Sequence, residues 1–339
     1  MKSITNAGIA ELLSRETERE GHTDRRARAL RRAARAALTW PREAAGLAEE
    51  GRLTELRAVG PWIAGIVEDL LDAEVEPPAP PAERAGFLTT AEARAVLAED
   101  PSWRASLRGD HQMHTTWSDG RATLEEMVEA ARALGREHVV VTDHSSGLPI
   151  AKGMSDDRLL EQGGAIAALG DPGIRVLRGV EMNLSLEGEP DVPPDVLARL
   201  DLALGSFHSK LRLTDDQTDR YLAAVRHPGV DVLAHPRGRR YGSRVGLTAD
   251  WPRVLAAAAA SGTAVEGNAH PDRQDLDVRL LEVARDAGAW VSVGTDAHRV
   301  EELEHVELAL AALALARFPK DRVLNFLPAE EVRAWAGRG

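Results

Sequence analysis

Histidines and carboxylates recur in short polar motifs in the second two-thirds of the chain, and each motif follows a short apolar run. The six motifs are Gly109-Asp-His-Gln-Met-His-Thr-Thr-Trp-Ser-Asp-Gly120, Thr142-Asp-His-Ser145, Gly179-Val-Glu-Met-Asn183, Phe207-His-Ser-Lys210, Ala234-His-Pro-Arg237 and Gly294-Thr-Asp-Ala-His298. Imidazoles and carboxylates serve as general acids and bases, and they are also ligands for zinc, manganese and iron. The chain has no cysteine, so only nitrogen and oxygen atoms are available to hold a metal.

The number of these groups favours a metal centre over a cluster of free histidines. Several imidazoles and carboxylates that converge on one cleft would repel one another or stay unpaired unless cations held them. Two carboxylates and about five histidines exceed the needs of one tetrahedral site. We therefore expect two or three divalent ions, Zn, Mn or Fe. A titratable histidine cluster without metal is the alternative.

Short β-rich runs alternate with helical patterns after residue 100, which is typical of repeated βα units and a parallel sheet. The seven expected strands are Ser106–Gln112, His138–Thr142, Ile174–Gly179, Leu202–Ser206, Asp231–Ala234, Ala264–Gly267 and Trp290–Val293. Seven units in this length predict an α/β fold with a closed, TIM-like (β/α) barrel, and a doubly wound open sheet is the alternative. The strand ends of a barrel meet at one mouth, which would bring the six motifs together. No phosphate-binding GxxxxGK[ST] loop and no GxGxxG motif is present, which argues against nucleotide binding.

Strand alternation predicts which side chains of the first motif face the mouth. Successive side chains of a strand point to opposite faces, so Asp110, Gln112 and His114 are expected on one side. His111 and Met113 are then expected to point into the layer between barrel and helices. The same reasoning places Asp296 and His298 on one side of the last motif.

The N-terminal part has a different character. Residues 1–72 are helical in pattern, with Thr23 or Asp24 as the N-cap of a second helix. Residues 73–100 hold a proline-rich linker, VEPPAPPAERAG, and a connecting helix. We place the larger domain at residues 101–339. The 339 residues include 42 basic and 54 acidic side chains, a net charge of −12, which excludes an overall basic nucleic-acid coat. The sequence shows no signal peptide and no apolar run long enough to span a membrane, so we expect a cytoplasmic protein without membrane contact.

The six motifs, together with EGNAHPDRQDLD after the sixth strand, resemble the PHP (polymerase and histidinol phosphatase) domain over residues 105–320. The version at the C-terminus of bacterial family X DNA polymerases is the most similar. The resemblance implies a distorted seven-stranded βα barrel, a trinuclear metal site and phosphoester hydrolysis. Its implied ligand groups are His114, Glu181 and Asp296; Glu181, His208 and His235; and Asp119, His144 and His298. Gln112 stands where the family usually has a histidine ligand, and His111 replaces a leucine.

The N-terminal segment resembles the small helical domain and the helix-hairpin-helix that begin family X polymerases. The hairpin usually reads Gly-x-Gly, where this chain has Ala58-Val-Gly60. An arginine-rich helix precedes it, and we expect Arg28, Arg31, Arg32 and Gly60 to contact DNA phosphates. A solvated helix face is the alternative for the arginines. About 20 residues beyond the proline linker leave no room for polymerase fingers and palm, so polymerase activity is not expected.

The expected chemistry is hydrolysis of a phosphate ester by a metal-activated water. We assign Glu181, Asp296 and His208 to catalysis, and Lys210, Arg237 and Arg239 to the phosphate. The leading substrate class is DNA ends, cleaved by a 3′-5′ exonuclease or 3′-phosphatase activity. The alternatives are a phosphatase for a small phosphate ester, of the histidinol-phosphate type, and a DNA-binding accessory module without catalysis of its own.

Overall fold

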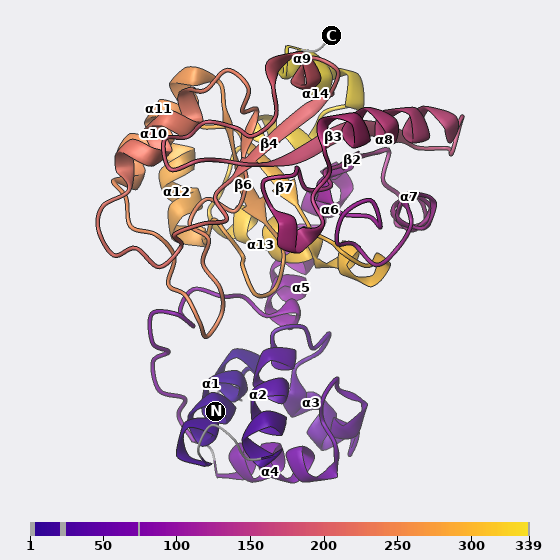
Figure 1. Ribbon diagram of the computed structural model, residues 1–339. Coiled ribbons are helices and arrows are strands. Elements are labelled where there is room, and N and C mark those ends of the chain that lie inside the picture. The colour runs from indigo at the N-terminus through magenta and orange to yellow at the C-terminus, as the bar shows by residue number, and fades with distance from the viewer. Residues whose placement is uncertain (1–3, 21–24, 74, 338–339) are drawn as a thin grey trace.

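The computed structural model describes residues 4–20, 25–73 and 75–337. Thr23 and Asp24, the expected N-caps, lie outside the described residues. A helical N-terminal region lies beneath a βα barrel in the view of Figure 1. Among the described residues, no helix is both long and apolar enough to cross a membrane.

The N-terminal region packs its helices around a hydrophobic core of its own, which includes Leu13, Leu30, Trp40 and Val67. Its elements are α1 (Asn6–Glu20), α2 (Arg25–Ala37), α3 (Ala44–Glu49), the 3-10 turn η1 (Leu53–Glu55) and α4 (Pro61–Asp72). The turn between η1 and α4 passes through Ala58, whose φ of 63° lies in the left-handed region that favours glycine.

The proline-rich linker is fixed to both parts of the molecule. The Arg84 guanidinium pairs with Glu11 of α1 at 2.7 Å. Further along, the amide of Leu88 donates to Gln274 of the barrel at 2.8 Å, and the Gln274 side chain donates back to the Leu88 carbonyl at 2.8 Å. Helix α5 (Thr90–Glu99) then leads into the barrel, and a capping box of Thr89 with Glu92 starts it.

The sheet contains seven parallel strands in the order β1 to β7, and the expected TIM-like barrel is confirmed, although it is only nearly closed between β7 and β1. The strands are β1 (Gly109–Met113), β2 (His138–Val141), β3 (Arg175–Asn183), β4 (Leu202–Ser206), β5 (Val232–Leu233), β6 (Ala264–Asn268) and β7 (Val291–Gly294). The first strand begins later than expected because residues Ser102–Ser106 form the short helix α6. The third strand continues beyond the expected end, which carries Glu181 within the strand itself.

No continuous ladder joins β1 to β7, and the seam is closed by side chains together with two backbone bonds, from Asp296 to Gln112 at 3.0 Å and from His114 to Ala297 at 2.8 Å. The buried Asn325 donates to the carbonyls of Gly109 and Val293 at 3.0 and 2.7 Å, and it accepts the Val293 amide at 2.6 Å. At the other end the amide of Thr295 donates to Asp110 at 3.1 Å, and its hydroxyl donates to the same carboxylate at 2.6 Å. These bonds satisfy backbone groups that would otherwise be unpaired at the seam.

Helices surround the strands and cover their outer faces (Figure 1). They are α7 (Leu124–Ala133), α8 (Asp156–Ala168), α9 (Pro194–Leu197), α10 (Thr218–Arg226), α11 (Trp251–Ser261), α12 (Val278–Asp286), α13 (Val306–Leu315) and α14 (Ala329–Trp335), with 3-10 turns η2 (Pro149–Ala151), η3 (Val300–His305), η4 (Lys320–Arg322) and η5 (Leu324–Phe326). One face of the strands packs on these helices. The other face lines the interior of the barrel, where residues such as Val140, Leu177, Leu204 and Val232 pack against one another. Polar side chains replace these apolar ones toward the C-terminal ends of the strands, where the site lies.

Candidate metal centre

Glu181 of β3 is the centre of the site, and four histidines surround its carboxylate. Its Oε1 lies 3.0 Å from Nε2 of His208 and 2.8 Å from Nε2 of His235. Its Oε2 lies 3.3 Å from Nε2 of His114 and 3.5 Å from Nδ1 of His144. The four histidines follow four different strands, β1, β2, β4 and β5. The barrel thus places imidazole nitrogens close to both oxygens of one carboxylate.

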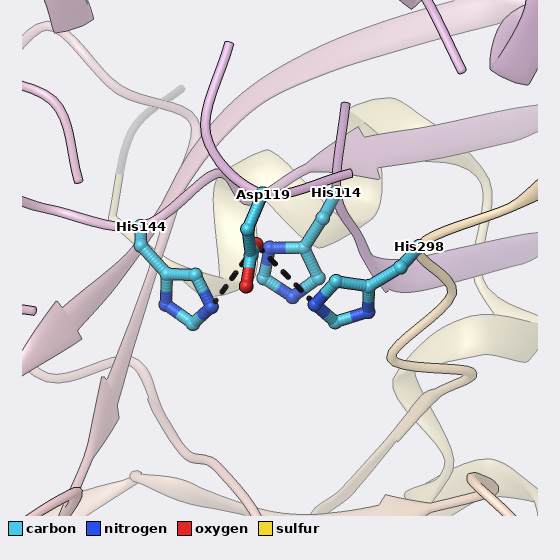
Figure 2. Close-up of side chains that lie close together, drawn as sticks. All are labelled: His114, Asp119, His144 and His298. Atoms are coloured by element: carbon cyan, nitrogen blue, oxygen red, sulfur yellow. Dashed lines mark ion pairs between the residues drawn. The ribbon is translucent and has the colours of Figure 1, made fainter. Parts of the chain in front are cut away.

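A second carboxylate, Asp119, joins the histidines on the other side of His114 (Figure 2). Its Oδ1 lies 3.3 Å from Nε2 of His298 and 3.7 Å from Nε2 of His144. The His114 ring stacks between those of His144 and His298, with centroid distances of 4.5 and 4.3 Å. Asp119 comes from the long loop after β1, and His298 follows β7.

Asp296 completes the site from the end of β7. Its Oδ1 lies 3.2 Å from Nε2 of His114, and its Oδ2 pairs with Nε of Arg273 at 2.8 Å. Asp296 has a φ of 55° and His235 a φ of 28°, so two of the site residues hold backbone conformations that cost energy outside glycine. Such strain persists only where the surrounding structure fixes it, and it clusters at functional sites.

The side chains fit divalent ions. Three groups have ligand atoms within 4.8 Å of one another: His114, Asp119, His144 and His298; His144, Glu181 and His208; and His114, Glu181 and Asp296. Neither ring nitrogen of the fully buried His114 makes a hydrogen bond, and Nδ1 of His144 and His235 also has none among the described residues. Buried polar atoms normally have partners, so these nitrogens indicate that a metal takes that place. The structure brings all eight expected His, Asp and Glu ligands together.

Charges within the site keep the carboxylates ionised. Burial alone would raise the pKa of Glu181, but the imidazoles of His114, His208 and His235, all within 3.3 Å of its oxygens, hold that pKa well below its usual range. Burial opposes ionisation of Asp296 as well, and Arg273 and His114 keep its pKa well below the usual value. Burial lowers the pKa of His144 to about 3, so its imidazole stays neutral, which is the form that ligates metals.

The first strand corrects the expected alternation of side chains. Asp110 pairs with Val139 of β2 and Met113 with Val141, so two residues of β1 lie opposite the single Val140. Because of this β-bulge, His111 does not point toward the helices. It lies fully buried inside the barrel, where its Nε2 is 2.9 Å from Nε2 of His138 and its Nδ1 is 2.9 Å from the hydroxyl of Ser292.

The same bulge separates Asp110 from the site and leaves Gln112 in it. Asp110 binds Thr295 instead, so its expected position beside Gln112 and His114 is wrong. The Gln112 amide donates to Oε2 of Glu181 at 2.9 Å. Ala297 is buried in the layer against the helices, while Asp296 and His298 both reach the site, as expected for a same-side pair.

The arginines expected to bind phosphate have other partners. Arg237 and Arg239 both donate to Oδ2 of Asp277, at 2.8 and 2.9 Å, and Arg239 also reaches the carbonyls of the linker residues Ala85 and Gly86. Their partners lie far away in the sequence, so motif position alone could not reveal them. Lys210 is exposed beside His208.

Sequence reasoning missed the contribution of β6, although that strand also ends in polar residues. Asn268 donates to Asp296 and to Gln112, both at 3.3 Å, and Glu266 accepts the amide of His235 at 2.6 Å. Arg273 follows on the next loop and has no protein hydrogen bond on its two terminal nitrogens within the described part of the chain. The polar ending of this strand, Glu266-Gly-Asn268, was the available signal.

Comparisons with known proteins agree with this geometry. The PHP domain family matches residues 110–243. A probable phosphatase of Edwardsiella ictaluri is 30% identical over 230 residues, which cover 65% of this chain and 90% of that protein. The chain belongs to the PHP domain family. As a PHP member it is a hydrolase of the phosphoesterase class.

Two further relatives of this PHP domain protein differ in size. The DNA polymerase/3′-5′ exonuclease PolX of Bacillus subtilis is 35% identical over 235 residues, which are 68% of this chain but only 41% of PolX. A solved histidinol phosphate phosphatase of Lactococcus lactis, in complex with zinc, L-histidinol and phosphate, aligns with a TM-score of 0.48 and 17% identity. That alignment covers 62% of this chain and 94% of the phosphatase.

Proposed function

We propose that the protein hydrolyses phosphate esters at DNA ends, as a 3′-5′ exonuclease or a 3′-phosphatase, with two or three divalent ions at Glu181, Asp119 and Asp296. The observation that carries this proposal is the sharing of Glu181 among His114, His144, His208 and His235. The proposed ligands are the three groups of side chains whose ligand atoms lie within 4.8 Å of one another. His235, 2.8 Å from Glu181, joins the group that contains Glu181 and His208. Zinc, manganese and iron all accept this set of nitrogen and oxygen donors.

Bound ions would supply a water of lowered pKa and neutralise charge on the phosphate oxygens. The protein residues orient these components. Glu181 presents one oxygen to each half of the site, and the Ser206 hydroxyl fixes Oε1 by a hydrogen bond of 2.7 Å. Asp296 orients His114, and we assign His208, whose side chain is partly exposed, to contact with the reacting phosphate.

The phosphate itself is assigned to Arg273 and Lys210. Arg273 is anchored by Asp296 through Nε, and its terminal nitrogens remain available for the charge-assisted hydrogen bonds that phosphate oxygens accept. The positions of Arg237 and Arg239 support a different role, because their bonds to Asp277 and to the linker shape the loop beside the site.

The position of the N-terminal helices supports a DNA substrate over a small one. They lie on the side of the barrel where the strands end, and Arg35 of α2 contacts Asp272 of the loop after β6. Arg28, Arg31 and Arg32 are exposed on α2, in line with the proposed DNA contacts, and Gly60 begins α4. PolX of Bacillus subtilis, a relative at 35% identity, is named a 3′-5′ exonuclease.

A small-molecule phosphatase is the second proposal, because the chain matches 90% of a relative that is named a probable phosphatase. Metal-loaded protein should be assayed on end-labelled single-stranded DNA and on histidinol phosphate. We expect release of nucleotides or of terminal phosphate from DNA, and faster turnover of histidinol phosphate would support the second proposal. Turnover of neither substrate would favour an accessory module.

The Glu181→Gln variant tests the role of the metal centre in either reaction. The amide keeps the shape of the side chain but removes the charge that two sets of ligands share, so we expect loss of at least one metal equivalent and a fall in turnover of 100-fold or more, on the order of a lost electrostatic contact at an active site. Glu187→Gln, an exposed change shortly after the same strand, is the control. Full metal content and activity in Glu181→Gln would exclude Glu181 as the shared ligand.

A further inference from the structure

One face of helix α2 carries a row of arginines that leads to the barrel. Arg25, Arg28, Arg32 and Arg35 are spaced by three or four residues, so they lie along one face, and together with Arg31 they line a shallow groove. Arg25 and Arg35 are ten residues apart, a rise of about 15 Å at 1.5 Å per residue.

The row ends at the loop that follows β6. The Arg35 guanidinium lies 2.5 Å from Oδ2 of Asp272, and the next residue, Arg273, pairs with Asp296 of the metal centre at 2.8 Å. Two adjacent residues of this loop therefore have different partners: Asp272 contacts the end of the arginine row, and Arg273 contacts the metal centre. Arg244 and Arg240 lie near the same loop, since Arg240 approaches Asp272 at 3.7 Å.

Among the described residues, no acidic side chain neutralises the first part of the row. Arg25, Arg28 and Arg32 make no ion pair with the residues that the structure describes, whereas Arg42 and Arg52 pair with Glu50 on the same domain. Like charges three or four residues apart destabilise a helix by about 0.2–0.5 kcal/mol per pair. A chain with a net charge of −12 thus retains a costly positive row, which suits an external polyanion.

An exposed tryptophan next to the start of the row identifies the kind of polyanion. Trp62 is 43% exposed, and it is the only aromatic side chain in the described residues that is exposed by more than a third. The Arg26 guanidinium lies 5.7 Å from the centre of its ring. An aromatic ring beside arginines stacks nucleobases, whereas a chain of phosphates without bases has no use for it.

We propose that the arginine row, Trp62 and the loop of residues 269–277 form one path along which a single strand of nucleic acid reaches the metal centre. This path rests on the proposed phosphoesterase function. Its length of about 15 Å corresponds to four or five nucleotides at about 3.4 Å per nucleotide of stacked strand. Oligonucleotides of that length and longer should bind, while dinucleotides should bind far more weakly.

The first test is the salt dependence of binding. Labelled decathymidylate with phosphorothioate linkages, which resist hydrolysis, is titrated with the metal-loaded protein at 50 and 200 mM salt. The R25A/R28A/R32A variant loses three phosphate contacts, which should lower the slope of log affinity against log salt by about two. Between 50 and 200 mM salt, its affinity should therefore fall by a factor roughly twentyfold smaller than that of wild type. The matched control is R199A/R253A/R279A, which removes the same charge from exposed barrel arginines. Equal slopes in the two triple variants would overturn the path.

The second test separates nucleic acid from other polyanions. Trp62→Ala should weaken decathymidylate binding roughly five- to 150-fold, in the range of one stacked base, and Trp62→Phe should retain most of the affinity. An abasic oligomer of the same length should bind wild type and Trp62→Ala equally. If inorganic polyphosphate competes as well as decathymidylate and Trp62→Ala has no effect, the groove binds polyanions without bases and the nucleic-acid path is wrong.

The proposed function is tested apart from the path. Wild-type protein is assayed with bis(p-nitrophenyl) phosphate, a small diester too short to reach the row. Hydrolysis of this diester together with unaltered decathymidylate binding in both the arginine and the tryptophan variants would overturn the path alone. Binding that responds to the variants in a protein that hydrolyses neither this diester nor the monoester p-nitrophenyl phosphate would overturn the proposed function and leave the path supported.

Discussion

Single residues of this site act through the neighbours that the barrel gives them. Glu181 and Glu266 are both fully buried carboxylates, yet the pKa of Glu181 lies well below its usual range while burial, followed by Asp296, raises the pKa of Glu266 well above it. Histidines surround Glu181, whereas only a backbone amide and Asn268 donate hydrogen bonds to Glu266. The first carboxylate is thus suited to hold cations and the second to shape the backbone at His235.

The pH dependence of metal binding follows from two imidazoles. Burial lowers the pKa of His114, but Asp296 and Glu181 raise it well above 6.5, and Asp119 helps to raise that of His298. Both rings must lose a proton to ligate, so protons compete with metal already above pH 6.5. Zinc affinity should therefore fall as the pH drops, and the fall steepens toward about tenfold per pH unit for each such ring below its pKa.

Competition with a chromophoric chelator at pH 8, 7 and 6 measures this dependence. The loss of affinity between pH 8 and pH 6 should be smaller in His298→Ala than in wild type, because one ring that must lose a proton is gone. It should not change in His144→Ala, because burial lowers the pKa of His144 to about 3 and the ring is neutral throughout this range. Equal losses of affinity in wild type and His298→Ala would contradict the assignment.

His111 provides a test of the corrected strand register. Its ring fills the barrel interior between His138 and Ser292, so His111→Ala leaves a cavity and removes the hydrogen-bond partner of both side chains. We expect the free energy of unfolding to fall by about 2–4 kcal/mol. Urea denaturation of the two proteins measures the difference. A loss below about 0.5 kcal/mol, as for a surface side chain, would contradict the interior position.

At the scale of elements, the sequence predicted the order of strands and helices better than it predicted the orientation of single side chains. Seven apolar runs, six of them followed by a polar motif, were enough to predict the barrel and the convergence of His114, Glu181 and Asp296. The extra residue in β1 was not visible, because a bulge in a parallel pair depends on register with β2 and leaves no period in the sequence. His111 was misplaced for that reason.

One end of the seam between β1 and β7 is held by a single side chain. Asn325 makes three buried hydrogen bonds with Gly109 and Val293, and its replacement by Ala would leave a backbone amide and two carbonyls unpaired. Each unpaired buried group costs about 1–3 kcal/mol, so Asn325→Ala should lower the unfolding free energy by about 3 kcal/mol or more. Thermal unfolding measures this loss of stability. Asn183→Ala on β3 is not a suitable control, because Asn183 contacts His208 of the site. Gln217→Ala, remote from the seam, is the suitable control, and an equal change in both variants would show that Asn325 has no special role.

At the scale of the whole molecule, the proline-rich segment acts as a strap between the helices and the mouth of the barrel. Glu11 holds it at Arg84, the Arg239 side chain binds the carbonyls of Ala85 and Gly86, and Gln274 binds Leu88. Two of these contacts come from the loops beside the metal centre. The relative position of the two parts is therefore set by contacts that cross the site, and the stiffness of proline alone is not needed to explain it.

The strap predicts how the linker opens. Gln274→Ala removes both hydrogen bonds to Leu88, and their loss should favour local opening by about 1.4 kcal/mol, or tenfold, since a typical hydrogen bond contributes about 0.5–1.5 kcal/mol. Trypsin should then cut after Arg84 about ten times faster, which mass spectrometry detects as a fragment that begins at Ala85. Gln217→Ala, in which the lost side chain bonds only to Asp215 and Asp216, should be cut at the wild-type rate. Unchanged cleavage in Gln274→Ala would mean that the other contacts alone hold the linker, and the helices would then keep their place on the barrel without the loop that carries Arg273.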